Sequence, residues 1–363
     1  MSVIASQLAP HHVSGPGYFM QQHCLECRKT NPNQNTFCQR ATCPAEQSPW
    51  VLEPGEWIEN LEIVRVVLIG RAATIYQARR NSQLVTLKVA HPGQRFKQHL
   101  EDEAQFLKSQ RKDRLVYLPL LLDPYTKDAQ KRLVLSEDDW SYGRAAIHDT
   151  LLYFLVFEHI EGEPLRDLLS KRPQLWSYHA GWITQSMAIA IQELHESQLL
   201  HLAISDESAL VTFDGDDVPR VVMIDFGTVL HKGDQISDKS YQLAQSAYSA
   251  TDLRPGSTSS PHADLYSLAI LFAQMLLGSL PASTPVNIPS MSKLSAIINR
   301  VLTAQISSAA DFTAELKQVF GVVPEPRTNR WLTGATTLHV TIALLGMTFL
   351  ALVALTLYNA FML

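Results

Sequence analysis

The stretch over residues 331–363 contains no Asp, Glu, Lys or Arg, and it restricts the fold more than any other feature of the chain. An α-helix rises about 1.5 Å per residue, so about 20 apolar residues cross the ~30 Å hydrocarbon core of a bilayer. Residues 340–358 supply that length and are interrupted only by threonine and glycine. A core helix that is apolar on every face would be unusual. The sequence therefore predicts one transmembrane helix over residues 331–360.

Charge predicts how the chain is placed at the membrane. Arg327 and Arg330 stand just before the apolar run, and nothing positive follows it, so the positive-inside rule keeps the large N-terminal part in the cytoplasm. The N-terminus lacks a basic region followed by an apolar run, so we expect no signal peptide. The whole chain carries 30 Lys+Arg against 35 Asp+Glu, a net charge of −5, and has no long basic stretch. This composition argues against a nucleic-acid partner.

All four cysteines lie close together, at Cys24, Cys27, Cys38 and Cys43. Two close pairs separated by a short loop present four thiolates to a tetrahedral Zn²⁺ ion. Two disulfides or free thiols are the alternatives, but disulfides fit poorly with a cytoplasmic domain. We therefore predict a structural zinc ribbon over residues 23–44, after a disordered tail over 1–22; His23 is a weaker alternative ligand.

A proline-rich linker over 45–56 precedes a long globular region over 57–325. Apolar and β-branched runs predict strands over 61–69, 74–79, 83–90 and 151–157. Residues 95–110 have helical spacing, and residues 123–149 are charged and punctuated by Gly and Ser, which predicts a surface insertion. Another helix is expected over 178–199. A hairpin over 210–224 follows and ends in Asp225-Phe226-Gly227.

The order of these segments and their motifs resembles the protein kinase fold over roughly residues 60–320. The resemblance rests on five short stretches of sequence. It implies a two-lobed α+β fold, and the cysteine segment resembles the zinc ribbon found before some bacterial kinase domains. The five stretches are Val85-Thr86-Leu87-Lys88, the hinge over 155–162, Leu194-His195 before His201, Ile224-Asp225-Phe226-Gly227, and Asp264-Leu265-Tyr266-Ser267-Leu268.

The resemblance also implies a site for ATP and Mg²⁺. Lys88 would contact the nucleotide phosphates and pair with Glu103, and Asp225 would bind Mg²⁺. The resemblance assigns nucleotide contacts to Gly70 in the glycine-rich loop and to Glu158 and Ile160 in the hinge. A structural ion-pair network without nucleotide is the alternative interpretation of Lys88, Glu103 and Asp225.

The catalytic loop departs from the family pattern. Ala203 stands where the family has its catalytic Asp, Ser205 where it has Lys, and Ser208 where it has the metal-binding Asn. An alanine methyl neither accepts nor orients the proton of a substrate hydroxyl. The glycine-rich loop is also eroded, because Leu68 and Ala73 replace two of its three glycines. These losses predict a pseudokinase.

Two hypotheses follow from these observations. In the first, the protein is a membrane-tethered scaffold or regulator that binds cytoplasmic signalling proteins and transfers no phosphate efficiently. In the second, it is a divergent active Ser/Thr kinase in which Asp206, three residues beyond Ala203, serves as the acid. We favour the first because the losses fall together in one loop. The tail contains no Gly-x-x-x-Gly pair, so the sequence leaves the oligomeric state open.

Overall fold

The computed structural model describes residues 22–23, 30–31, 51–110, 117–126, 141–147, 150–238, 243–244 and 246–325. The chain divides into two compact units, Met1–Val323 and Pro324–Leu363. Within the described residues, no helix combines the length and the apolar character needed to cross a bilayer. The transmembrane helix predicted over 331–360 lies outside those residues and stays a prediction.

Little of the predicted zinc ribbon is described. Two short strands, β1 (Gln22–His23) and β2 (Thr30–Asn31), pair in antiparallel fashion. The four cysteines and most of the predicted disordered tail lie outside the described residues, so the zinc site stays a prediction. The end of the predicted linker is described: Leu52 is buried in the core of the following domain.

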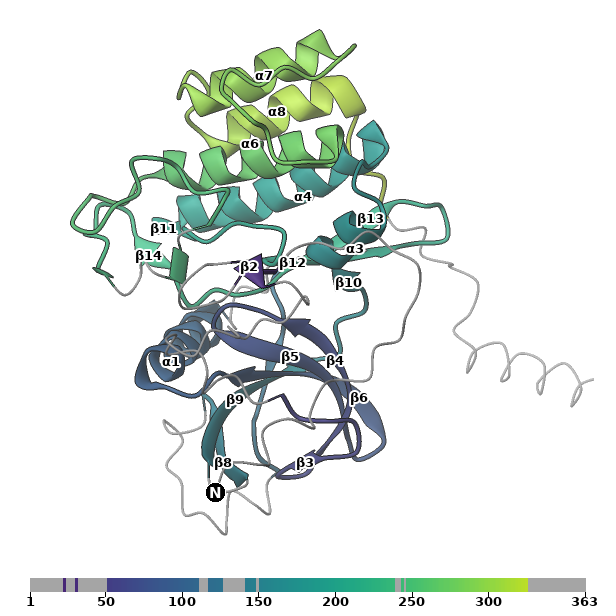
Figure 1. The fold of residues 1–363 in the computed structure, drawn as a ribbon, viewed down its shortest axis with the longest axis vertical. Helices are drawn as coiled ribbons and strands as arrows, with labels where there is room; N and C mark the ends of the chain where they lie inside the picture. Colours follow the sequence, from purple (N-terminus) through teal and green to yellow (C-terminus); the bar gives the residue numbers. More distant parts are fainter. Residues whose placement is uncertain are drawn as a thin grey trace, which may run out of the picture. The chain divides into compact units, whose positions relative to one another are not determined.

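An antiparallel sheet forms the N-terminal lobe of the first unit (Figure 1). Four of its strands, β4, β5, β6 and β9, carry the β-branched and apolar runs that predicted them, and short turns join β4 to β5 and β5 to β6. The path runs in the order β3-β4-β5-β6-β9-β7, with β8 pairing to β9 off this path. The strands are β3 (Trp57–Ile58), β4 (Leu61–Ile69), β5 (Ala73–Arg80), β6 (Gln83–Ala90), β7 (Leu121–Leu122), β8 (Gly143–Ile147) and β9 (Thr150–Glu158).

Strand β8 corrects one expectation. Residues 123–149 were expected to form a surface insertion, but Gly143–Ile147 pairs with β9 along its whole length. The segment Gly-Arg-Ala-Ala-Ile has weak intrinsic β propensity. The sheet edge offered by β9 supplies the hydrogen bonds that make it a strand, a tertiary effect that local sequence does not reveal.

One long helix, α1 (Gln94–Ser109), packs against this sheet. The positions Phe96, Leu100, Ala104 and Leu107 recur at helical spacing, and all four are buried, so the predicted apolar face is confirmed. Glu103 is buried beside this face and forms an ion pair with Lys88 of β6. The helix thereby carries a carboxylate to the predicted site.

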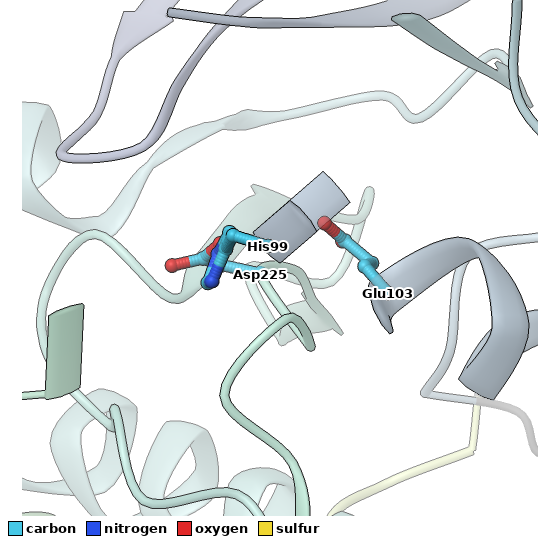
Figure 2. A group of neighbouring side chains, drawn as sticks. All are labelled: His99, Glu103 and Asp225. Atoms are coloured by element: carbon cyan, nitrogen blue, oxygen red, sulfur yellow. The ribbon is translucent and has the colours of Figure 1, made fainter. Parts of the chain in front are cut away.

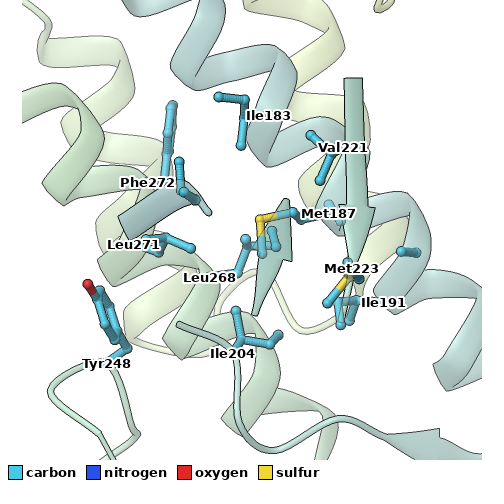
Figure 3. Packing of buried hydrophobic residues seen from close by; sticks show 14 of the residues in the cluster. Ile183, Met187, Ile191, Ile204, Val221, Met223, Tyr248, Leu268, Leu271 and Phe272 are labelled. Carbon is cyan, nitrogen blue, oxygen red and sulfur yellow. The ribbon is translucent and has the colours of Figure 1, made fainter. Parts of the chain in front are cut away.

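The C-terminal lobe is mainly helical (Figure 1). Its core lies between α4, α6 and β13, where Met187, Leu268 and Met223 are fully buried together (Figure 3). Helix α6 begins with Pro261 and ends at Leu277, and Gly278 caps it with a positive φ of 78°, which suits glycine. The helices are α3 (Leu165–Lys171), α4 (Ser177–Glu196), α6 (Pro261–Leu277), α7 (Ser292–Leu302) and α8 (Ala309–Phe320).

Two small sheets complete this lobe and carry the loops of the site. The first has the order β10-β12-β13, and the second pairs β11 with β14. Together with the N-terminal lobe they make the two-lobed α+β architecture that the sequence predicted. Their strands are β10 (Glu163–Pro164), β11 (Leu199–Leu200), β12 (Ala209–Phe213), β13 (Pro219–Met223) and β14 (Leu230–His231).

Candidate functional site

Lys88, Glu103 and Asp225 meet in one charged cluster between the lobes. The Lys88 ammonium, from β6, donates to Glu103 Oε2 at 2.5 Å and to Asp225 Oδ1 at 2.8 Å. Glu103 comes from α1, and Asp225 follows β13. The side chains of Lys88 and Glu103 are buried, whereas that of Asp225 is partly exposed. The structure thus brings together the three charged residues that the sequence assigned to one site.

A fourth residue, His99, belongs to this cluster and was not predicted. Its Nε2 lies 2.8 Å from the same Asp225 Oδ1 atom that Lys88 contacts. Figure 2 shows His99 beside Asp225, with Glu103 reaching in from α1. His99 precedes Glu103 by four residues, which places both on one helix face. That spacing was visible in the sequence, but a histidine on an apolar helix face is usually a core residue.

Close packing holds α1 against the segment that carries Asp225. A Cβ atom at Gly227 would lie 2.3 Å from the backbone oxygen of His99. Only glycine permits that approach, so the helix and the Asp225-Phe226-Gly227 segment are in direct contact. Phe226 is fully buried and stacks on Phe106 of α1, with ring centroids 5.2 Å apart.

Electrostatics favour the ionised forms of Asp225 and Lys88. Burial raises the pKa of the Asp225 carboxyl, but the neighbouring Lys88 and His99 outweigh it and hold that pKa well below its usual range. Burial likewise opposes the charge on Lys88, while Asp225 and Glu103 raise its pKa above the ordinary value. One potential ligand atom from each of His99, Glu103 and Asp225 lies within 4.8 Å of the others. A divalent cation at Asp225 would compete with two protein groups for Oδ1.

The hydroxyls of the catalytic loop are used within the loop itself. Ser208 Oγ donates to the Ser205 backbone oxygen at 2.7 Å and accepts from the Ser205 amide at 3.0 Å. Ala203 is buried and offers only a methyl group. Ser205 and Ser208, at the positions where the family has its Lys and its metal-binding Asn, therefore hydrogen-bond to each other in a small turn, and Ala203 precedes them.

Asp264 fixes the start of this loop. Its carboxylate is fully buried and accepts hydrogen bonds from the backbone amides of His201 at 2.9 Å and Leu202 at 2.7 Å. His195 Nε2 lies 2.9 Å from Asp264 Oδ2. A buried carboxylate needs such partners. Asp264 thus organises the loop as the resemblance implies.

Asp206, the acid of the active-kinase hypothesis, belongs to a different network. It is buried beside Glu207, Arg166 and Tyr248. Burial, followed by the charge of Glu207, raises the pKa of Asp206 to about 6, against the opposing effects of Arg166, Tyr248 and Arg71. The Tyr248 hydroxyl also donates to Gln274 Oε1 at 2.6 Å, which fixes it in the interior of the lobe.

The turn that replaces the glycine-rich loop is tied to the C-terminal lobe. Gly70 lies between β4 and β5, and its carbonyl oxygen is 2.8 Å from His91 Nε2. Arg166 Nη1 donates to the Ile69 backbone oxygen at 3.2 Å and to Glu207 Oε1 at 3.0 Å. Arg71 Nη1 donates to the Leu243 backbone oxygen at 3.1 Å. Two arginines thereby tie the turn to the C-terminal lobe.

The second residue that sequence reasoning missed is Thr86 of β6, which contacts the hinge. The backbone amide of Ile160, a predicted nucleotide contact, donates to the Thr86 hydroxyl at 3.0 Å. Thr86 is two residues from Lys88 in β6 and is buried. The amide of Glu158, the other predicted hinge contact, donates to the Leu120 backbone oxygen at 2.9 Å. Both hinge amides named by the sequence are engaged within the protein.

Apolar side chains from both lobes meet next to the hinge. They form one buried cluster, here called the apolar quartet, with Val67 and Ile160 packed against it. Adenine carries ring nitrogens that accept hydrogen bonds, so a hinge that binds it needs a free N–H. The engaged hinge and the quartet do not fit an adenine ring in this arrangement, although Lys88 and Asp225 are suited to phosphate and metal. The quartet consists of Leu68, Ile75, Leu210 and Ile224.

Comparison with known proteins agrees with this architecture. The chain belongs to the protein kinase domain family, which matches residues 62–325. A crystal structure of a double mutant of the Mycobacterium tuberculosis PknI kinase domain has a TM-score of 0.54 and 17% identity, and covers 74% of this chain and 99% of that chain. At this identity the likeness concerns the fold alone.

Sequence relatives include bacterial Ser/Thr kinases. Mycobacterium tuberculosis PknL is 29% identical over 129 residues, which is 35% of this chain and 31% of that protein. Bacillus subtilis PrkC is 25% identical over 132 residues, or 36% of this chain and 20% of that protein. Arabidopsis thaliana AtPK2/AtPK19 is 24% identical over 263 residues, which is 71% of this chain and 50% of that protein. The matches therefore span half or less of these relatives' lengths.

Proposed function

We propose that the chain is a membrane-tethered signalling protein whose kinase-like domain acts as a pseudokinase. The catalytic loop carries this proposal. Phosphoryl transfer in protein kinases needs an Asp that accepts the proton of the substrate hydroxyl and an Asn that holds a metal ion. Ala203 supplies no acceptor, and the Ser208 hydroxyl is committed to Ser205 on both its donor and acceptor sides. The domain then serves as a scaffold or regulator for cytoplasmic signalling proteins.

The divergent active kinase is the competing candidate. It requires Asp206 to reach the substrate hydroxyl in place of Ala203. The buried position of Asp206 beside Arg166 and Tyr248 counts against that role, because a general base must lie within about 3 Å of the proton it removes. Loss of a positioned base alone lowers transfer by ~10²–10⁴-fold.

The membrane part of the proposal rests on the apolar run over 331–363 and on Arg327 and Arg330 before it. The zinc part rests on the spacing of the four cysteines. With four thiolates in its coordination shell, a Zn²⁺ ion has no open position for a catalytic water, so the ribbon would stabilise the fold or dock a partner.

A phosphotransfer assay tests the function directly. The full-length chain, purified in detergent, is incubated with ATP labelled at the γ-phosphate, Mg²⁺ or Mn²⁺, and a general protein substrate. We expect incorporation no higher than that of the Lys88→Ala variant. Incorporation that exceeds Lys88→Ala and is abolished by Asp206→Asn would replace the pseudokinase with the active kinase.

Two further measurements test the tether and the partners. The full chain should stay in the membrane fraction after an alkaline carbonate wash, whereas a chain lacking residues 331–363 should be released. Full-length protein in the soluble fraction would contradict the tether. Crosslinking in intact membranes should recover a cytoplasmic signalling protein, and recovery of none would contradict the scaffold role.

A further inference from the structure

We propose that the protein's own side chains fill the nucleotide cleft of this domain. The Thr86 hydroxyl accepts the hydrogen bond of the Ile160 hinge amide, and the apolar quartet occupies the space of the adenine ring. The domain would then keep its closed form without ATP. This inference rests on the proposed function and deepens it, because it describes how the same cleft is regulated. Contacts at the hinge, between the lobes and at the phosphate end support it.

The first contact engages the amide hydrogen of the hinge. A backbone amide has one hydrogen, and that of Ile160 is directed at Thr86 Oγ1 at 3.0 Å. Thr86 is only 4% exposed and lies opposite Phe157 in the β6–β9 pairing, so the hydroxyl is held near the hinge by the sheet. Threonine is β-branched and has restricted χ1 freedom. An incoming purine would have to break this hydrogen bond and displace a stiff side chain.

The second contact removes the space for the ring. Leu68 and Ile75 come from the N-terminal lobe, and Leu210 and Ile224 come from the C-terminal lobe. All four are at most 4% exposed and belong to one contact cluster. Contacting carbon atoms lie within about 4.5 Å, whereas a ring stacked between two apolar surfaces separates them by about 7 Å. The lobes must therefore move apart before a ring can enter.

The third set of contacts holds the phosphate end closed. Arg166 joins the Ile69 carbonyl to Glu207, and Arg71 joins the same turn to the Leu243 carbonyl. Asp225 Oδ1 is contacted by Lys88, and also by His99, which Figure 2 shows beside it. These two nitrogen groups occupy one of the two carboxylate oxygens, so a metal ion at Asp225 would have to bind Oδ2 or displace them. Internal contacts thus hold the cleft at its hinge, ring and phosphate ends.

Binding of Mg-ATP to the full-length chain tests the inference. Equilibrium dialysis with labelled ATP, up to millimolar concentration, is compared for the wild type and for a Thr86→Ala/Leu68→Gly double variant that frees the Ile160 amide and opens the roof of the cleft. Thr86→Ser keeps the hydroxyl, and Thr313→Ala removes a buried hydroxyl in α8, remote from the cleft. Circular dichroism establishes that each variant is folded.

We expect no saturable binding by the wild type, Thr86→Ser or Thr313→Ala, and at least tenfold more bound ATP in the double variant. Saturable binding by the wild type would overturn the inference. A folded double variant that binds no more ATP than the wild type would also overturn it, because Thr86 and Leu68 would not be the block. A wild type that binds ATP but transfers no phosphate contradicts this inference alone, whereas one that transfers phosphate contradicts the proposed function too.

Discussion

The hydroxyl oxygen of Thr86 lies 3.0 Å from the backbone amide nitrogen of Ile160 and accepts its hydrogen bond. This bond joins β6 to the hinge between residues 74 positions apart. The Ile160 amide, which the sequence assigned to nucleotide binding, thus donates its hydrogen bond within the protein.

Removal of the Thr86 hydroxyl should weaken the fold slightly. Thr86→Ala leaves the buried Ile160 amide without its acceptor, and we expect the free energy of unfolding to fall by about 1–2 kcal/mol. Thr86→Ser should lose less, because it keeps the acceptor. Urea denaturation of the full-length chain in detergent measures both. Equal losses in the two variants would mean that the methyl group, not the hydrogen bond, supplies the stability.

Replacement of Asp206 should stabilise the protein in a defined pH range. The pKa of this carboxyl rises from 3.8 to about 6 on folding, so the folded state binds the proton more tightly. Stability therefore decreases as the pH rises from about 4 to about 6, and the ionised carboxylate remains unfavourable above that range. Asp206→Asn removes this effect and should add about 1–3 kcal/mol near pH 7.5, but almost nothing near pH 4.

Denaturation of wild type and Asp206→Asn at both pH values provides the check. A loss of stability in Asp206→Asn near neutral pH would show that Arg166 stabilises the carboxylate more than burial destabilises it. A loss of phosphate incorporation in the same variant would instead indicate a catalytic role.

His99 should stabilise the junction between α1 and Asp225. His99→Ala removes a buried contact to the Asp225 carboxylate and leaves a cavity next to Gly227. We expect a loss of about 2–4 kcal/mol in the free energy of unfolding. His262→Ala, in α6, serves as the comparison because its Nε2 lies 3.2 Å from a backbone oxygen, that of Val301, rather than from a carboxylate, and its ring packs edge-on against Tyr266. Comparable losses in the two variants would contradict a special role for His99.

Much of the architecture was predictable because its signals are local. The strands over 61–69 and 83–90 have the bounds expected from their apolar runs, and the buried face of α1 follows its helical period. The cluster of Lys88, Glu103 and Asp225 followed from the ordered motifs. These signals depend on residue order and periodicity, which a single sequence displays.

The rest depends on contacts between distant segments. Strand β8 has weak β propensity and forms because β9 offers it an edge. The contact of His99 with Asp225 requires the packing of α1 on Gly227. The bond from Ile160 to Thr86 depends on the register of β6 against β9. Local sequence patterns do not contain this geometry, so the sequence did not predict these contacts.

The cysteine segment leads to a prediction about metal content. If Cys24, Cys27, Cys38 and Cys43 hold a structural zinc ion, the purified chain should contain one Zn²⁺ per molecule by elemental analysis. Cys24→Ser should lose that zinc, whereas Thr36→Ser in the same segment should retain it. A metal-free wild type purified without chelator, or a Cys24→Ser variant with full zinc content, would contradict the site.

Hydrogen exchange at the Ile160 amide tests the central claim most directly, because it reports on the hinge itself. In the full-length chain without nucleotide, we predict slow exchange at Ile160 that is unchanged by millimolar Mg-ATP. The Thr86→Ala variant should exchange faster at this amide, since its acceptor is gone. Rapid exchange at Ile160 in the wild type that becomes slow when Mg-ATP is added would contradict the account, because an open, nucleotide-binding hinge behaves that way.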